Sequence, residues 1–376
     1  MKTPRRVDIE ITSRCNLRCR YCYFFDNPDS EYGDLPAAEW LKFIEELGNC
    51  SVMTVCLLGG EPFIRNDLPQ IIEGIVKNRM RFSILTNGGL IDDDTAAFLK
   101  KTGRCDGIQV SVDGSTAETH DSCRGEGSFE AAMHGIHLLR SHGLPVTVRV
   151  TLHRKNVKQI DNIARFLLEE VGLPMFSTNA AGYLGACKSS ASDILLSTAE
   201  RREAMLTLKR LSDAYPSRIT ALAGPLADAR FWLRMEEARS KSSPPFPNGG
   251  RLTGCGCSFE NIAVRSDGSY IPCNLLPHLA LGRINRDPLG EVWIENEILN
   301  ALRGRSRIRL SDCEFCSDCD YIPYCTGNCP AIAYGMTGKI DQPGPDACLR
   351  HFLAEGGDLG DLLKHDLSAE ADNHAE

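Results

Sequence analysis

Three cysteines near the start of the chain have a spacing suited to a metal centre. Cys15, Cys19 and Cys22 lie within eight residues, in the stretch CNLRCRYCYF, just after a strand-like run at 7–12. A single loop can bring three such thiols to one centre. A structural zinc ion or a fully ligated iron–sulfur cluster takes four protein ligands, so three thiols leave one metal position open to a ligand that is not protein. The alternatives are a zinc loop completed by a distant fourth Cys, and three unrelated core thiols.

A second motif, GGEP at 59–62, follows the hydrophobic run VMTVCLL. Two adjacent glycines let the backbone approach a ligand closely, and the carboxylate of Glu61 can receive an ammonium group. On its own, the motif is also consistent with a plain turn. The Cys triplet, Tyr21 directly before the third Cys, and the GGEP motif together resemble the radical SAM superfamily.

That resemblance implies a specific cofactor chemistry. In the superfamily, three Cys hold a [4Fe–4S] cluster and S-adenosylmethionine (SAM) chelates the fourth iron. The resemblance places the cluster on Cys15, Cys19 and Cys22. It places the amino group of SAM on Gly60 and Glu61. It also implies that SAM is cleaved homolytically to a 5′-deoxyadenosyl radical, which abstracts hydrogen from an unactivated carbon.

Further candidate SAM contacts follow the fourth strand-like run. Ser111 and Asp113, in IQVSVDG, carry a hydroxyl and a carboxylate that could hold the ribose or the carboxylate of SAM. Arg124 resembles the arginine that meets the SAM carboxylate in peptide-modifying relatives, and Tyr21 belongs with the cofactor-binding candidates. The alternatives are a plain turn at Asp113 and a surface charge at Arg124.

The elements that must position these residues alternate between strands and helices. Hydrophobic periodicity predicts strands at 7–12, 52–58, 82–85, 108–112, 146–152 and about 175–179, and helices at 36–47, 68–77, 92–101, 129–141 and 157–170. Such alternation predicts an α/β fold with a parallel sheet, here a partial (β/α)6 barrel of the radical SAM type. Active sites of these folds lie at the carboxyl ends of the strands, where the candidate residues fall. Residues 86–88 are further candidates for this edge, whereas we expect His153 to be only a histidine at a strand end.

The second half of the chain is rich in cysteine, and nine of the seventeen Cys fall between Cys255 and Cys348. Their order and spacing resemble the SPASM domain, whose members hold two auxiliary [4Fe–4S] clusters. We expect this Cys-rich domain to contain short helices and a β-hairpin at 261–273 that turns at 266–268. The resemblance assigns one auxiliary cluster to Cys255, Cys257, Cys273 and Cys329, and the other to Cys316, Cys319, Cys325 and Cys348.

The first of these auxiliary sites departs from the usual pattern. Cys255 and Cys257 are separated by one residue, which is closer than usual in the group. Cys313 is a surplus thiol that could replace one of them. A zinc ribbon that uses Cys316 and Cys319 is the alternative. With the cluster on the first Cys triplet, the resemblance implies three [4Fe–4S] clusters in all.

These assignments divide the chain into four parts. We predict a radical SAM partial barrel at 1–185, a helical connecting region and linker at 186–250, a SPASM domain at 251–354 and an acidic C-terminal tail at 355–376. The connecting region is expected to contain helices at 198–215 and 225–240, followed by the Pro- and Ser-rich stretch SKSSPPFPNGG.

Composition limits the partners and the compartment. The 376 residues are 42% hydrophobic and 24% charged, which is ordinary for a globular protein. No run of about 18 apolar residues is present, so we expect no membrane partner, and the net charge of −8 argues against nucleic acid. The N-terminal residues lack the apolar segment of a signal peptide, which predicts a cytoplasmic protein. Clustered Cys in such a protein indicate metal rather than disulfides.

Together these features predict an enzyme, namely a radical SAM/SPASM peptide maturase. Members of this group mostly modify ribosomally made peptides or proteins, so we expect a precursor peptide as the substrate. The expected product is an intramolecular crosslink, with a carbon–carbon cyclophane favoured and a thioether possible. An external one-electron reductant such as a flavodoxin or ferredoxin is implied. Peptide recognition would use the barrel, the 186–250 region or a separate protein.

Two other functions remain open. One is oxidation of a Cys or Ser in a protein, as in anaerobic sulfatase maturation, or dehydrogenation of a small-molecule alcohol. Sulfatase maturases keep an Asp base after the Cys equivalent to Cys273, where this chain has Asn274, whose amide cannot accept a proton in that way. Asp113 or a His could replace that base, so no catalytic residue is assigned. The other is an iron–sulfur electron carrier or zinc-held interaction module, which leaves GGEP unexplained.

Overall fold

The computed structural model describes residues 2–25, 33–253 and 256–364. Its centre is a sheet of ten strands with the order β10-β9-β8-β1-β2-β3-β4-β5-β6-β7. The strands from β1 to β7 are parallel to one another, and β8 is also parallel to its neighbour β1. The strands are β1 Arg6–Thr12, β2 Thr54–Gly59, β3 Arg81–Thr86, β4 Cys105–Ser111, β5 Val146–Leu152, β6 Phe176–Ala180, β7 Ile219–Ala221, β8 Asn261–Val264, β9 Ser269–Ile271 and β10 Gly282–Arg283.

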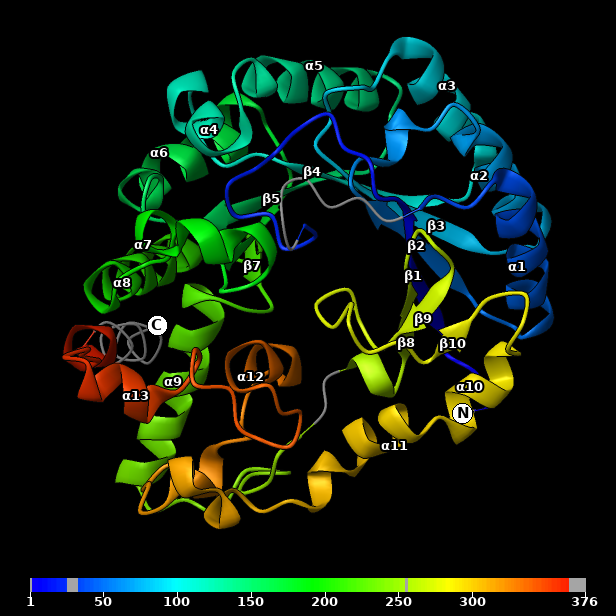
Figure 1. Cartoon of the computed structure of the whole chain (residues 1–376). Coiled ribbons are helices and arrows are strands. Elements are labelled where there is room, and N and C mark those ends of the chain that lie inside the picture. Colours follow the sequence, from blue (N-terminus) through cyan, green and yellow to red (C-terminus); the bar gives the residue numbers. More distant parts are fainter. Residues whose placement is uncertain (1, 26–32, 254–255, 365–376) are drawn as a thin grey trace, which may run out of the picture.

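Helices cover the outer face of the curved sheet (Figure 1). Local sequence sets where they start and stop: Asp92 caps α3 by accepting a hydrogen bond from Thr95 N, and Gly103 ends it in the left-handed conformation. The helices of this layer are α1 Ala37–Asn49, α2 Leu68–Lys77, α3 Asp93–Thr102, α4 Ala117–Arg124, α5 Ser128–Ser141, α6 Ile160–Arg165, α7 Ala191–Ile194 and α8 Thr198–Ala214.

The two faces of the sheet differ in polarity. Val7, Ile9 and Ile11 on β1 are fully buried in the core between the sheet and the outer helices, against Trp40 and Phe43 of α1. Burial of each such side chain contributes about 1.5–3 kcal/mol. Because side chains alternate along a strand, the intervening residues of β1 face the inside of the barrel, and they are polar. The interior is therefore suited to hold polar groups.

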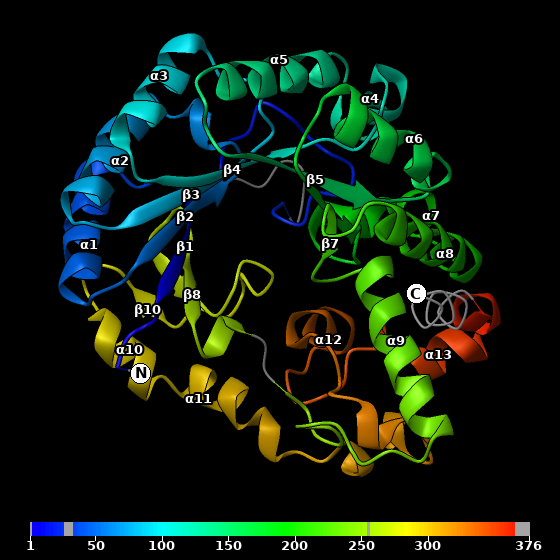
Figure 2. The same cartoon turned by 180° about the vertical axis from the view of Figure 1, so that it is seen from behind.

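The Cys-rich part of the chain continues this sheet and closes the molecule into a ring (Figures 1 and 2). Strands β8 and β9 form the predicted hairpin, in which Gly268 N donates to Arg265 O at 2.8 Å. Residues 261–264 of β8 pair directly with residues 6–9 of β1. The remaining helices complete the ring, namely α9 Pro225–Ser240, α10 Leu289–Glu295, α11 Glu297–Gly304, α12 Pro330–Thr337 and α13 Leu349–Ala354.

The α/β fold class and the partial parallel barrel are confirmed. The structure adds strand β7, which pairs with β6 and comes from the region predicted to be helical. None of the helices in the described part of the chain combines the length and hydrophobicity that a membrane span requires.

Candidate functional site

The loop that carries the three cysteines is anchored by groups outside it. The Asp34 carboxylate accepts a hydrogen bond from Thr12 Oγ1 at 2.6 Å and pairs with Arg14 Nε at 3.0 Å. On the other side, a Cβ atom on Gly185 would lie 2.5 Å from Cys22 O, so this position tolerates only glycine. The segment after β6 therefore packs directly against the backbone of the Cys loop.

The two glycines of the GGEP motif serve the same anchoring. Gly60 N donates to Thr12 O and Glu61 N donates to Arg14 O, both at 2.9 Å. A Cβ on Gly60 would lie only 2.1 Å from Arg14 O, and Gly59 has a φ of +132°. Glycine is needed here because the end of β2 runs against the Cys loop, which explains the motif by packing within the protein.

Glu61 lies at the carboxyl ends of β2 and β3, completely buried. Its Oε1 accepts hydrogen bonds from Thr86 Oγ1 at 2.8 Å and Phe63 N at 3.2 Å, and its Oε2 accepts one from Asn87 N at 2.7 Å. Burial raises the pKa of Glu61 to about 7, although these donors act to lower it. The structure thus brings the GGEP motif and residues 86–88 to one site.

Asp113 is the hub of a buried polar network. Its Oδ2 lies 2.6 Å from Arg124 Nε and accepts the Tyr21 hydroxyl, while its Oδ1 accepts Thr151 N at 2.7 Å. Burial acts to raise the pKa of Asp113, but Arg124, together with His153 and His120, outweighs it and holds that pKa below its usual value. Arg124 Nη1 lies 3.9 Å from Cys19 Sγ. Arg124 is thus a buried residue rather than a surface charge, and the network ties the Cys loop to β4, β5 and α4.

Ser111 and His153 flank this network. Ser111 ends β4 and is partly exposed on the strand face opposite to the buried core residues. His153 directly follows β5 and is fully buried, with its ring stacked on Tyr21 at 5.4 Å between centroids. Burial lowers the pKa of His153 to about 4. Its Nε2 has no hydrogen-bond partner among the described residues.

The three thiols of the loop lie close enough to influence one another. Burial is the main cause that raises the pKa of Cys15 to about 11 and that of Cys19 to about 12, and the Cys22 thiol contributes to both shifts. They are therefore protonated when no metal is bound, and ligation of a metal would release protons. Within the described ranges, no three His, Cys, Asp or Glu side chains are placed to hold a single metal ion. A [4Fe–4S] cluster binds each Cys through a different iron, so thiols that are too far apart for a single ion can still hold it. Three Cys on an anchored loop, with the Arg124 guanidinium beside Cys19, fit such an anionic cluster.

The auxiliary Cys residues form two groups. Burial raises the pKa of Cys316 to about 12, with further contributions from the predicted co-ligands Cys325, Cys348 and Cys319 and from the surplus Cys313. In the other group, Cys273 and Cys329 pack in one cluster around Leu276, Leu302 and Ala331, and Cys257 and Cys329 both act electrostatically on Arg305. Cys255 lies outside the described residues.

Glu10, which no motif in the sequence singled out, is a buried carboxylate inside the barrel. Its Oε1 accepts a hydrogen bond from Asn274 Nδ2 at 2.8 Å, and its side chain is almost fully buried. Burial raises the pKa of Glu10 to about 7, although Asn274 acts to lower it. A carboxylate from β1 is therefore placed beside the amide that follows Cys273.

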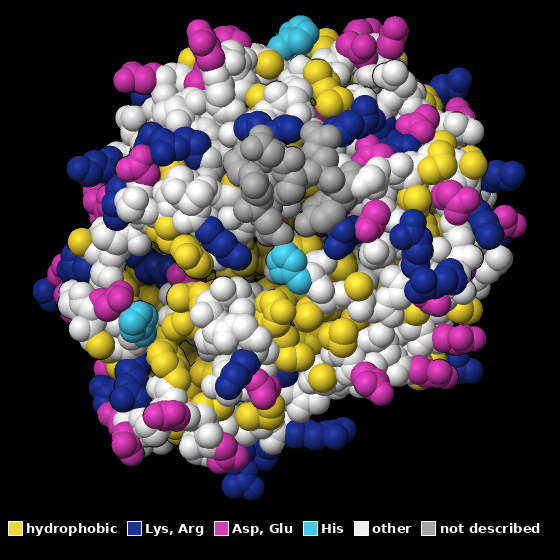
Figure 3. Space-filling model, viewed as in Figure 1, with side chains coloured by type: hydrophobic (Ala, Val, Ile, Leu, Met, Phe, Trp, Pro, Cys, Tyr) yellow, Lys and Arg dark blue, Asp and Glu magenta, His cyan; other side chains and the backbone are white. Residues whose placement is uncertain are grey.

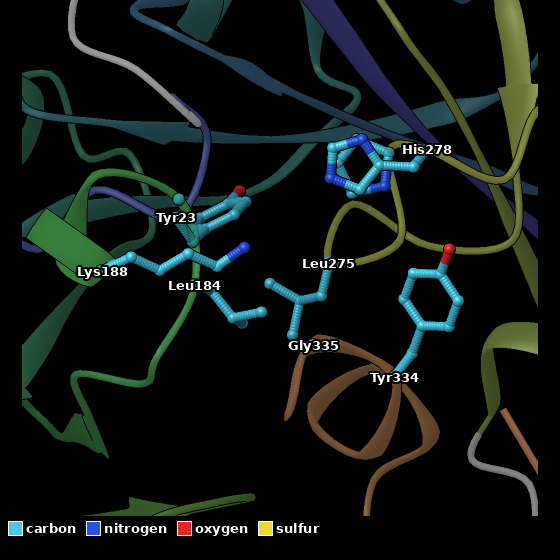
Figure 4. Close-up of a pocket in the computed structure, with 9 residues that line it drawn as sticks. Tyr23, Leu184, Lys188, Leu275, His278, Tyr334 and Gly335 are labelled. Carbon is cyan, nitrogen blue, oxygen red and sulfur yellow. The ribbon is translucent and has the colours of Figure 1, made fainter. Parts of the chain in front are cut away.

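A cavity of about 110 Å³ lies where the barrel meets the Cys-rich part. Figure 4 shows its walls converging from the end of the Cys loop, the segment after β6, the loop after β9 and helix α12. Tyr23, which lines it, interacts electrostatically with Glu10. The lining residues are Tyr23, Leu184, Gly185, Lys188, Leu275, Pro277, His278, Tyr334 and Gly335.

Two protein-family models match the chain. Residues 9–167 match the radical SAM superfamily, and residues 255–320 match the SPASM iron–sulfur cluster-binding domain. The first match covers the end of β1, strands β2 to β5, the Cys loop and the Asp113 network, and the second covers the hairpin and the first auxiliary cysteines.

Individual relatives extend over most of the chain. An AdoMet-dependent heme synthase of Methanosarcina barkeri is 29% identical, covering 91% of this chain and 95% of its own. A PqqA peptide cyclase of Granulibacter bethesdensis is 26% identical, covering 94% of this chain and 91% of its own. Among solved structures, SuiB of Streptococcus suis bound to its precursor peptide SuiA has a TM-score of 0.70 at 16% identity, covering 93% of this chain and 76% of that one. The chain therefore contains a radical SAM domain, over residues 9–167, and a SPASM domain, over residues 255–320.

Proposed function

We propose that this radical SAM enzyme is a maturase of a ribosomally made peptide and forms an intramolecular crosslink in it. A carbon–carbon cyclophane is the favoured linkage and a thioether is the second. The observation that carries the proposal is the size of the cavity between the barrel and the SPASM domain. At about 110 Å³ it is small, which suits one amino-acid side chain.

The main alternative is a tetrapyrrole substrate, as the names of the Fe-coproporphyrin III synthase and heme synthase relatives suggest. Pockets that enclose a whole small molecule usually measure about 300–1,000 Å³, which is well above this cavity. Hydrophobic side chains also gather in the middle of the face shown in Figure 3, beside hollows, whereas charged side chains lie mostly toward the periphery. An apolar surface next to a small cavity suits an extended peptide that inserts one side chain.

The peptide-acting relatives support the same choice. The PqqA peptide cyclase matches nearly the whole chain, and a subtilosin biosynthesis protein of Bacillus subtilis is 26% identical over 329 residues. SuiB, whose fold this chain shares, binds a precursor peptide.

We propose three [4Fe–4S] clusters. Cys15, Cys19 and Cys22 hold the cluster that binds SAM. When bound, this cluster and SAM together supply a 5′-deoxyadenosyl radical that abstracts a substrate hydrogen. The protein's own residues position the substrate and move protons. Glu10 interacts with two segments that line the cavity. It interacts electrostatically with Tyr23 and accepts a hydrogen bond from Asn274. With a pKa of about 7 it can take up the substrate proton near neutral pH.

The proposal is tested with reconstituted protein, SAM and a flavodoxin or ferredoxin system under anaerobic conditions. The substrates compared are short peptides encoded beside the gene and Fe-coproporphyrin III. We expect a peptide to lose two hydrogens and to show a linkage between two residues in tandem mass spectrometry, while the tetrapyrrole stays unchanged. Conversion of the tetrapyrrole alone would contradict the peptide proposal. Loss of two hydrogens without a linkage would instead favour an oxidising maturase.

Glu61→Gln tests the proposed SAM site without removing a cluster ligand. Its amide nitrogen would face a donor, Asn87 N or Thr86 Oγ1, and the negative charge that attracts the SAM ammonium group would be lost. A charge-assisted hydrogen bond contributes about 1.5–3 kcal/mol, so we expect SAM to bind roughly tenfold to a hundredfold more weakly at unchanged iron content. The measurement is anaerobic calorimetry, with the exposed Glu73→Gln on α2 as the matched control. Unchanged SAM affinity would show that GGEP only anchors the Cys loop.

A further inference from the structure

Arg305 is a buried guanidinium whose hydrogen-bonding capacity the described residues leave incompletely used. It follows α11 and is 1% exposed. Its Nε and Nη1 donate to backbone carbonyls, Thr253 O at 3.4 Å and Gln342 O at 3.3 Å, both long for N–H···O bonds. Its Nη2 has no hydrogen-bond partner in the described part of the chain. No carboxylate among those residues forms an ion pair with it.

A buried cation in this state requires an anionic partner. Transfer of an unpaired charge out of water is so costly that buried charges in proteins are paired or bind a metal group. Burial lowers the pKa of Arg305, and the groups that oppose this are Cys329, Asp341, Cys257 and Cys313. Three of these four are thiols, and two of the three are predicted ligands of the same auxiliary cluster.

We propose that Arg305 is the positive partner of the iron–sulfur cluster held by Cys257, Cys273 and Cys329, and that its Nη2 donates a hydrogen bond to a sulfur of that cluster. This inference rests on the auxiliary clusters of the proposed function. Net charge and hydrogen bonds to the sulfurs are among the factors that set the reduction potential of such clusters. A cation that donates a hydrogen bond favours the more negative, reduced form. Arg305 therefore raises the potential of this cluster.

The test compares midpoint potentials in Arg305→Met, Arg305→Lys and the control Arg307→Met, whose side chain is exposed two residues away. Each is made in a background in which Cys15, Cys19 and Cys22 are replaced by Ala, so that only auxiliary clusters contribute to redox titrations followed by electron paramagnetic resonance. We expect Arg305→Met to make reduction of one cluster about tenfold less favourable, a fall of about 59 mV for one electron. Arg305→Lys should shift it less, and Arg307→Met should leave both potentials unchanged.

A second measurement covers the case in which Arg305→Met loses iron. Protein labelled with ¹⁵N-arginine is reduced and examined by pulsed electron paramagnetic resonance for coupling between a cluster and a guanidinium nitrogen. A coupling that disappears in Arg305→Lys supports the proposal, and absence of any coupling overturns it. Two unchanged potentials in Arg305→Met at full iron content also overturn it, while the proposed function stands. A background protein without auxiliary iron would instead overturn the cluster assignment, and this inference with it.

Discussion

Replacement of Cys15, Cys19 and Cys22 by Ala is expected to abolish 5′-deoxyadenosine formation entirely. It should also lower the iron content from about twelve to about eight per chain, because each [4Fe–4S] cluster contributes four. The fold should survive, since the Cys loop is held by Asp34 and by the end of β2 through contacts that do not involve the thiols. The measurements are iron and sulfide analysis after anaerobic reconstitution, and chromatography of the SAM products.

The matched control replaces two thiols that belong to no predicted site, Cys50 and Cys105. These lie directly after α1 and at the start of β4, and their replacement by Ala should leave iron and 5′-deoxyadenosine formation near the unmodified values. Unmodified protein that bound zinc and only trace iron would contradict the cluster assignment. Equal loss of iron in the control and in the triplet variant would show that the thiols act through folding alone.

Elements with strong hydrophobic periodicity were predictable from the sequence. Strand β5 and helix α2 have the predicted bounds, and the β8–β9 hairpin turns where the Ser-Asp-Gly sequence indicated. Helix α4 was not predicted, because AETHDSCR is polar and gives no apolar period. Strand β7 was missed because three residues are too few to show alternation.

The site was harder to predict because its partners come from distant parts of the chain. The sequence singled out Asp113 and Arg124 separately as SAM contacts, and the structure pairs them with each other in a buried ion pair. In the sequence, Asn274 indicated only that the carboxylate which sulfatase maturases have after the Cys equivalent to Cys273 is missing here. The carboxylate that contacts it, Glu10, lies 264 residues away and is brought there because β8 pairs with β1. Such pairing leaves no local signal.

For Arg305 the local sequence does give a signal, but that signal is misleading. The stretch RGRSRIRL contains four arginines in eight residues and is typical of a solvated surface. Only the packing of α11 and the following turn shows that Arg305 is buried while Arg307 and Arg309 are exposed. Burial of a single charge within a basic run therefore became visible only in three dimensions, and it pointed to the cluster beside it.

Arg124→Met is expected to destabilise the protein by about 3–5 kcal/mol, the usual cost of removing one partner from a buried ion pair. It would leave Asp113, which is completely buried, with the Tyr21 hydroxyl and Thr151 N as its remaining partners. We also expect SAM affinity to fall, because the guanidinium beside Cys19 is the cation proposed to meet the SAM carboxylate. The measurements are anaerobic urea unfolding and calorimetry with SAM. The exposed Arg230→Met on α9 is the control and should change neither quantity.

The double variant Asp113→Asn/Arg124→Met separates the two roles of Arg124. Replacement of both members of a buried pair by neutral groups leaves no uncompensated charge, so most of the lost stability should return. The amide introduced at position 113 would still accept Thr151 N through its oxygen, and its nitrogen can donate to the Tyr21 hydroxyl. SAM binding should remain weak, because no neutral side chain at position 124 replaces the cation. Recovery of SAM affinity together with stability would show that Arg124 only positions the Cys loop and does not bind the cofactor.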